Sequence, residues 1–207
     1  MNTSLVLLLH GVGSNGADLA GLGQLWRQQL PEARFVSPDA PFAFDGGGAG
    51  RQWFSLAGVT ADNRPARVEA ARAAFDGVIA PIVAAQGLED RLDRVALVGF
   101  SQGTIMALDA VVSGRWPVAA LLGYSGRLAS PGPFAPFAPS PRTRVALIHG
   151  GSDPVIPPAE TTDAAARLAA LGIAAGSTIL PGLGHTISRE GAEIGAAFLA
   201  ASLAPTG

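Results

Sequence analysis

The stretch RVALVGFSQGTIMALDAVV, residues 94–112, joins two hydrophobic patterns at one short turn. Its first part is continuously apolar, as strands covered on both faces are, and its last part carries apolar residues at helical spacing. The turn between them, GFSQG at 99–103, matches G-x-S-x-G, in which a strained strand-to-helix turn lifts a serine hydroxyl above a sheet. The alternative for Ser101 is an ordinary turn with a serine that caps the helix.

The same alternation of strand and helix patterns runs along the chain. We predict strands at residues 4–9, 34–37, 94–99, 118–123, 144–149 and 176–180. We predict helices at 18–30, 65–85, after 101, after 158 as far as 171, and at 188–203. Such alternation is typical of βα units on a mostly parallel sheet. We therefore expect a single α/β domain over residues 1–207, with about six to seven strands and helices on both faces. Two long stretches, 38–60 and 126–142, are expected to be irregular.

The composition excludes several classes of protein. All 14 basic residues are arginine, and 16 acidic residues leave a net charge of −2, so no basic surface for nucleic acid is expected. The absence of cysteine excludes disulfides, thiolate metal sites and a cysteine nucleophile. No His/Asp cluster has metal-ligand spacing, so neither a metal nor a cofactor is expected. The apolar run at 5–9 is too short for a signal peptide or a membrane span, and we expect a cytoplasmic protein with no stable membrane insertion.

A serine nucleophile needs a base, and three histidines are available. His185 follows the last predicted strand and precedes the final helix, which makes it the best candidate for the base. His10 and His149 each end a predicted strand and are followed by glycine. For these two we expect hydrogen-bonded structural roles.

The base in turn needs a carboxylate to orient it. Asp153, in HGGSDPVIP at 149–157, lies between the serine and the base in the sequence. Folds with a G-x-S-x-G turn carry their catalytic residues in this order: serine, then aspartate or glutamate, then histidine. The alternative is that Asp153 forms a turn before Pro154. Asp109 and Asp163 lie inside predicted helices, and we expect both to be solvated.

Acyl transfer also needs hydrogen-bond donors for an oxyanion. The backbone N–H of Gln102, directly after the serine, is the first candidate. The second is the N–H of Val12 in HGVG at 10–13, where glycines allow close approach of the backbone. The alternative for HGVG is a simple tight turn, and one geometry could serve both purposes.

Taken in order, five motifs over residues 8–188 resemble those of the phospholipase/carboxylesterase family of α/β-hydrolases, which includes carboxylesterases and acyl-protein thioesterases: HGVGSNGADL, RQWF, GFSQG, HGGSDPVIP and GLGHTIS. The resemblance implies an α/β-hydrolase fold, a triad of Ser101, Asp153 and His185, and oxyanion donors at Val12 and Gln102. The chain departs from the family's usual residues at four positions, Val12, Thr104, Ser55 and Thr186, and none of these departures removes a catalytic group.

The substrate site is less clearly marked in the sequence. The family's RxWF tryptophan corresponds to Trp53, which we expect to wall the pocket; the alternative is a core aromatic residue. Phe134 and Phe137 are candidates for an apolar trough, or they pin a proline-rich loop to the domain. Residues 126–143 are too few for a cap domain, and we expect none.

The resemblance therefore implies a serine carboxylesterase that cleaves short- to medium-chain esters through an acyl-enzyme. Lysophospholipids and acyl thioesters stay open as substrates, and a homodimer stays open as the assembly. The alternative is a non-catalytic α/β-hydrolase-fold protein that binds a small apolar ligand, because a fold alone does not establish activity.

Overall fold

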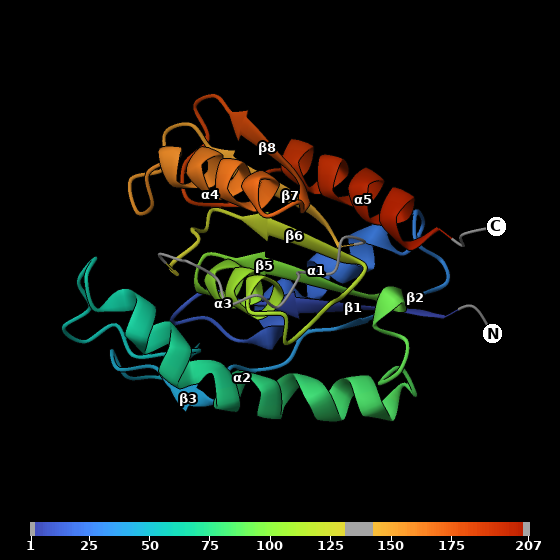
Figure 1. Ribbon diagram of the computed structural model, residues 1–207, viewed down its shortest axis with the longest axis horizontal. Helices are drawn as coiled ribbons and strands as arrows, with labels where there is room; N and C mark the ends of the chain where they lie inside the picture. Colours follow the sequence, from blue (N-terminus) through green and yellow to red (C-terminus); the bar gives the residue numbers. More distant parts are fainter. Residues whose placement is uncertain (1–2, 131–142, 205–207) are drawn as a thin grey trace.

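The computed structural model describes residues 3–130 and 143–204. Six parallel strands form one sheet in the order β2–β1–β5–β6–β7–β8, with helices on both faces (Figure 1). The strands are β1 (Ser4–Leu9), β2 (Ala33–Val36), β5 (Val95–Phe100), β6 (Ala120–Tyr124), β7 (Arg144–Gly150) and β8 (Ala174–Leu180), and the helices are α1 (Gly16–Trp26), α2 (Arg64–Ala85), α3 (Gln102–Val112), α4 (Ala159–Ala170) and α5 (Arg189–Leu203). The predicted α/β class and parallel sheet are confirmed, and the described residues contain no cap domain.

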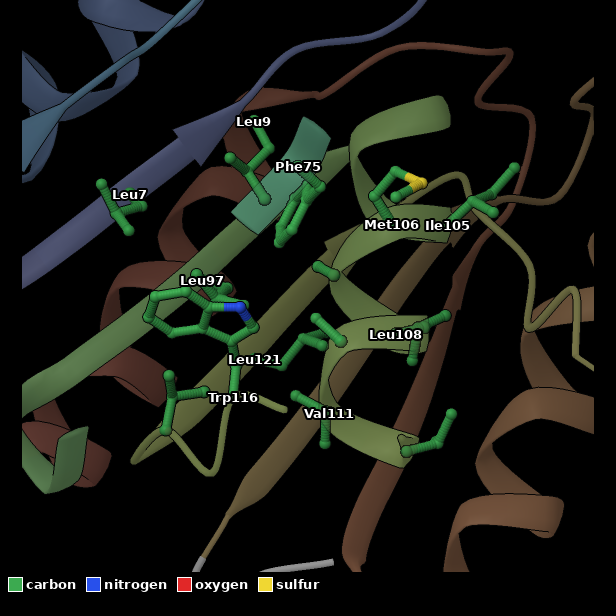
Figure 2. Close-up of a cluster of buried hydrophobic side chains, with 14 of the residues drawn as sticks. Leu7, Leu9, Phe75, Leu97, Ile105, Met106, Leu108, Val111, Trp116 and Leu121 are labelled. Carbon is green, nitrogen blue, oxygen red and sulfur yellow. The ribbon is translucent and has the colours of Figure 1, made fainter. Parts of the chain in front are cut away.

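The sheet divides the hydrophobic side chains between two cores. In β1, Leu5, Leu7 and Leu9 belong to one cluster, and Val6 and Leu8 belong to the other. Helices α2, α3 and α4 cover the first face of the sheet, and α1 and α5 cover the second (Figure 1). Figure 2 shows the first cluster, in which side chains of α3 pack onto β1, β5 and β6. Because both faces are covered, the central strands are apolar at successive positions.

A short hairpin was missing from the predicted elements. Strands β3 (Phe42–Ala43) and β4 (Arg51–Gln52) pair antiparallel inside the stretch 38–60, which was expected to be irregular. Strands of two residues are too short to leave a recognisable alternation of polar and apolar residues. The second stretch, with Phe134 and Phe137, lies largely outside the described residues, since 131–142 are not described. Among the described helices, none has the length and hydropathy that crossing a bilayer requires.

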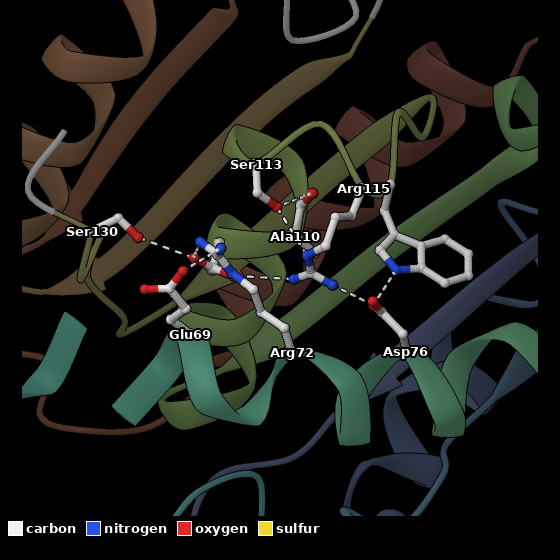
Figure 3. A network of polar contacts seen from close by, with 9 residues as sticks. Glu69, Arg72, Asp76, Ala110, Ser113, Arg115 and Ser130 are labelled. Atoms are coloured by element: carbon white, nitrogen blue, oxygen red, sulfur yellow. Dashed lines mark hydrogen bonds and ion pairs between the residues drawn. The ribbon is translucent and has the colours of Figure 1, made fainter. Parts of the chain in front are cut away.

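Asp109 is buried, and the expectation that it is solvated was wrong. It lies on α3, every residue of which is buried, because α3 packs between the sheet and α2. Its carboxylate accepts hydrogen bonds from Arg72 at 2.8 Å, Arg115 at 3.0 Å and Ser130 at 3.0 Å (Figure 3). Burial works against ionisation, but the contacts with Arg72, Ser130 and Arg115 outweigh it, so the pKa of Asp109 lies below its ordinary value. The network ties α2 and α3 to the segment after β6.

We expect Asp109→Ala to lower the free energy of unfolding at pH 7 by about 3 kcal/mol, because it leaves two arginines without their buried partner. The matched control is Asp163→Ala, whose carboxylate is 62% exposed beside Arg167 and whose loss costs less than about 1 kcal/mol. A lowered pKa in the folded state means that the contribution of Asp109 is present above the unfolded value of about 3.9 and is lost as pH falls through the folded value. Urea unfolding of both variants at pH 7 measures the difference; equal losses would contradict the burial argument.

Candidate active site

The predicted catalytic residues meet at the carboxyl edge of the sheet. Strand β5 leads directly into Ser101, and β7 is followed by the turn that holds Asp153. His185 lies in the loop between β8 and α5, and His10 follows β1. In parallel sheets this edge is where ligands bind, because all strands end there and their loops converge.

Ser101 has a strained backbone, with φ 53° and ψ −114°. Its N–H donates to Tyr124 O at 2.9 Å, which fixes the turn to β6. A Cβ at position 103 would lie 2.1 Å from Leu9 O, so the helix after the serine can approach β1 only with Gly103 there. The side chain of Ser101 makes no capping bond to α3, which contradicts the alternative of a helix-capping serine. Positive φ at a non-glycine residue costs about 1–3 kcal/mol and is found preferentially at active sites.

His185 and Asp153 form a direct hydrogen bond, in which His185 Nδ1 donates to Asp153 Oδ2 at 2.7 Å. The imidazole is 18% exposed, and the ring of Phe100 packs on it at a centroid distance of 5.0 Å. Because Nδ1 carries the donated hydrogen, Nε2 is the nitrogen that can accept a proton. Among the described residues Ser101 Oγ has no hydrogen-bond partner; catalytic hydrogen bonds are often long until substrate binds.

The loop of Asp153 is fixed on both sides of the carboxylate. Oδ1 accepts the N–H groups of Val155 at 2.8 Å and Ile156 at 3.0 Å, so Asp153 forms the turn that was its alternative role and also holds His185. Burial opposes ionisation, but the amide of Ile156, the imidazole of His185 and the amide of Val155 outweigh it and keep the pKa of Asp153 below its ordinary value. The carboxylate is therefore ionised wherever an imidazole titrates.

The loops of Asp153 and His185 are also joined to each other. Ser152 N–H donates to Leu183 O at 2.9 Å. A Cβ at position 150 would lie 2.3 Å from Gly184 O, so Gly150 permits this close approach. The contact places the residue before His185 against the end of β7.

The HGVG turn lies against the serine, since a Cβ on Gly11 would be 3.3 Å from Ser101 Cβ. His10 is buried and its two ring nitrogens are satisfied: Nδ1 donates to Gly11 O at 2.7 Å, and Nε2 accepts from Ala40 N–H at 2.9 Å. In a trans peptide the C=O and the next N–H point in opposite directions. The N–H of Val12 is therefore directed away from His10. Burial lowers the pKa of His10, which favours this neutral form.

Trp53 joins His10, the first residue of the HGVG turn, to Gln102. Its indole Nε1 donates to His10 O at 2.9 Å, and its backbone N–H donates to Gln102 Oε1 at 2.7 Å. The amide of Gln102 in turn donates to Phe54 O at 2.8 Å. The indole is 1% exposed and packs against Phe75 at 5.3 Å, the environment expected of a core aromatic residue. A role as a substrate wall stays a prediction for Trp53, as it does for Phe134 and Phe137, which lie outside the described residues.

Two residues at this edge have features that the sequence did not predict. Ser125, which follows β6 as Ser101 follows β5, also has a positive φ of 47°, and its buried hydroxyl has no partner among the described residues. His149 Nε2 lies 3.0 Å from Asp153 Oδ2, a contact that no sequence pattern predicts. Within residues 3–130 and 143–204, no group of three or more His, Asp or Glu side chains could hold a metal ion.

Known proteins resemble the chain over nearly all of its length. It is 36% identical over 186 residues to Esterase YpfH of Escherichia coli, an alignment covering 90% of this chain and 77% of that one. It is 27% identical to Acyl-protein thioesterase 1 of Neurospora crassa, over 91% of this chain and 82% of that one. The crystal structure of esterase PE8 superposes with a TM-score of 0.83 at 38% identity, covering 97% of this chain and 93% of that one. The family model described as Phospholipase/Carboxylesterase matches residues 1–203, and the chain therefore belongs to this family of hydrolases.

Proposed function

We propose that this protein is a carboxylesterase that hydrolyses short- to medium-chain esters through a Ser101–His185–Asp153 triad. The observation that carries the proposal is the bond from His185 Nδ1 to Asp153 Oδ2, at the edge of the sheet where Ser101 has a strained backbone. A binding protein would gain nothing from that strain, whereas a nucleophile held above the sheet needs it.

In the proposed reaction Ser101 Oγ attacks the ester carbonyl while His185 Nε2 takes its proton. Asp153 keeps the imidazole in the correct tautomer and stabilises the imidazolium. His185 then gives the proton to the leaving alkoxide, and an acyl-enzyme remains on Ser101. Water, activated by the same imidazole, attacks this ester and releases the acid.

We assign the oxyanion site to the N–H groups of Val12 and Gln102. Gln102 is the first residue of α3, and its N–H has no partner within the helix and lies at the positive end of the helix dipole. The N–H of Val12 is oriented through the Gly11 carbonyl that His10 holds. Both donors are positioned before the substrate arrives, which is the arrangement that makes such groups effective.

Two variants of His10 test this assignment. In His10→Asn the side-chain amide lies at the position of Nδ1 and can still donate to Gly11 O. In His10→Gln the side-chain amide reaches the position of Nε2 and can accept from Ala40 N–H, but the donor to Gly11 O is lost. We expect His10→Gln to lower kcat roughly 10²-fold with little change in KM, and His10→Asn to lower it less than about 10-fold. Melting temperatures of both variants serve as the control. Equal losses of kcat that follow the melting temperatures would sink the assignment.

The substrate class is tested with p-nitrophenyl esters of increasing chain length beside an acyl thioester. The absence of a cap domain from the described residues supports a site open to small esters. We expect kcat/KM to be highest for short to medium chains, and rates to follow a simple hyperbola through the critical micelle concentration. The similarity to acyl-protein thioesterases makes the thioester the informative comparison. A small-molecule ester partner, the cytoplasmic location and a homodimer remain predictions.

We expect kcat/KM to fall as pH is lowered from about 8 to about 5, because protonated His185 cannot accept the serine proton. Protonation of Asp153 does not contribute to this fall in kcat/KM, because its pKa is lowered and its carboxylate stays ionised throughout this range. The measurement is a pH–rate profile with and without EDTA, over a range in which the protein stays folded. A full rate at pH 4, or loss of activity with EDTA, would contradict the mechanism.

A further inference from the structure

A second imidazole lies against the carboxylate of Asp153. His149, at the end of β7, is fully buried, and its Nε2 is 3.0 Å from Asp153 Oδ2. The same oxygen accepts the hydrogen bond of His185 Nδ1 at 2.7 Å. Two imidazole nitrogens therefore lie within 3.0 Å of one carboxylate oxygen, although a triad requires only one imidazole there.

The proton positions on His149 follow from its other partners. Nε2 lies 2.9 Å from Ile156 O, and a carbonyl can only accept, so Nε2 carries a hydrogen. Nδ1 lies 2.6 Å from Thr161 Oγ1 on α4, whose hydroxyl can donate. The neutral tautomer with its hydrogen on Nε2 satisfies all these partners. Its N–H edge then faces both Ile156 O and Asp153 Oδ2.

These contacts fix the loop that carries Asp153. Ile156 donates its N–H to Asp153 Oδ1 at 3.0 Å and accepts from His149 through its carbonyl. His149 thus holds the loop to β7, and Thr161 holds the ring of His149 to α4. The positive edge of the imidazole also stabilises negative charge on Oδ2, which weakens the pull of that oxygen on the proton of His185.

We propose that His149 is a positioning residue for the reaction, a neutral imidazole that fixes the plane of the Asp153 carboxylate and moderates how strongly Asp153 stabilises the imidazolium of His185. The inference rests on the proposed function, because it takes Asp153 and His185 as members of the triad. His149 itself does not touch the substrate.

Few other groups face this cluster. From β5 the ring of Phe100 packs on His185. On α4, Glu160 precedes Thr161 but pairs with Arg127 at 3.0 Å. In the part of the chain that the structure describes, no further ionisable side chain hydrogen-bonds to or pairs with Asp153, His149 or His185.

A matched pair of His149 variants tests the two ring nitrogens separately, because each variant places a side-chain amide at the position of only one of them. In His149→Gln an amide N–H can occupy the position of Nε2 and still face Asp153. In His149→Asn the side chain reaches only the position of Nδ1, and Oδ2 loses the imidazole N–H edge that faces it at 3.0 Å. The acid limb of the profile is the fall of kcat/KM toward low pH. We expect this limb to move up by about one pH unit in His149→Asn, and kcat to fall about 10- to 100-fold. His149→Gln should keep the wild-type limb and recover most of kcat.

A second pair acts from α4 and leaves the histidine in place. Thr161→Val keeps the shape but removes the hydroxyl that hydrogen-bonds to His149 Nδ1 and holds the ring to α4, whereas Thr161→Ser keeps the hydroxyl. We expect Thr161→Val to move the acid limb in the same direction as His149→Asn, by a smaller amount, and Thr161→Ser to leave it unchanged. This pair keeps the proposal testable if His149→Asn does not fold.

A merely structural role for His149 would lower the melting temperature of its variants and leave the acid limb in place. An unmoved limb in His149→Asn and Thr161→Val therefore overturns the proposal. Ser101→Ala is assayed in the same series. If Ser101→Ala stays active, the triad itself fails; if it is inactive and the limb is unmoved, only the role of His149 fails.

Discussion

Ser101→Ala is expected to lower kcat by a factor on the order of 10⁵–10⁶, and His185→Ala by a similar factor, with the fold intact in both. The reason is that each change removes one half of a single proton-transfer unit. The double variant should then be hardly slower than either single variant, because the oxyanion donors and substrate binding supply what remains. The measurement is kcat on a p-nitrophenyl ester for the parent and all three variants.

The control for these variants is stability. Ser101 has φ 53°, a value that glycine adopts without strain, so Ser101→Gly should be inactive but at least as stable as the parent. Additive losses in the double variant would mean that serine and histidine act independently, and the triad would have to be abandoned.

Asp153→Asn should lower kcat on the order of 10⁴-fold. The aspartate accepts on both sides: Oδ1 takes the amides of Val155 and Ile156, and Oδ2 faces His185. An asparagine has one acceptor oxygen, so its NH₂ group must face either the backbone amides or the imidazole. The first choice breaks the turn, and the second forces His185 into the wrong tautomer.

Asp163→Asn is the matched control, because that carboxylate is exposed on α4 and should tolerate the change. Near-full activity in Asp153→Asn would leave Asp153 as a turn residue only. Glu160 is then the next acid to examine, although its carboxylate pairs with Arg127 in this structure.

The strand–turn–helix around Ser101 could be predicted because two strong patterns agree there: a continuously apolar strand and a turn with two glycines. Gly103 admits a close approach to β1, and Gly99 admits a close approach to the start of α3. The order of Ser101, Asp153 and His185 was readable for a similar reason, since each follows a strand of one parallel sheet. Their expected roles depended on all three residues lying at the same edge of the sheet.

Other features depend on partners distant in sequence, which no local pattern encodes. Asp109 was expected to be solvated, but α2 covers its helix and brings Arg72 from 37 residues away. The hairpin β3–β4 is too short for periodicity, yet the segment after it brings Trp53 beneath His10. The start of α1 was readable, since Asn15 and Asp18 form a capping box, but the helix was predicted to begin two residues late, at residue 18.

The most direct test of the proposed chemistry is covalent labelling with a fluorophosphonate probe, followed by mass spectrometry of the peptides. Such a probe reacts with a serine whose proton is taken by a neighbouring base. One adduct is expected, on Ser101, with labelling abolished in Ser101→Ala and strongly slowed in His185→Ala. An unlabelled protein, or an adduct that persists in Ser101→Ala, would contradict the assignment of Ser101 as the nucleophile.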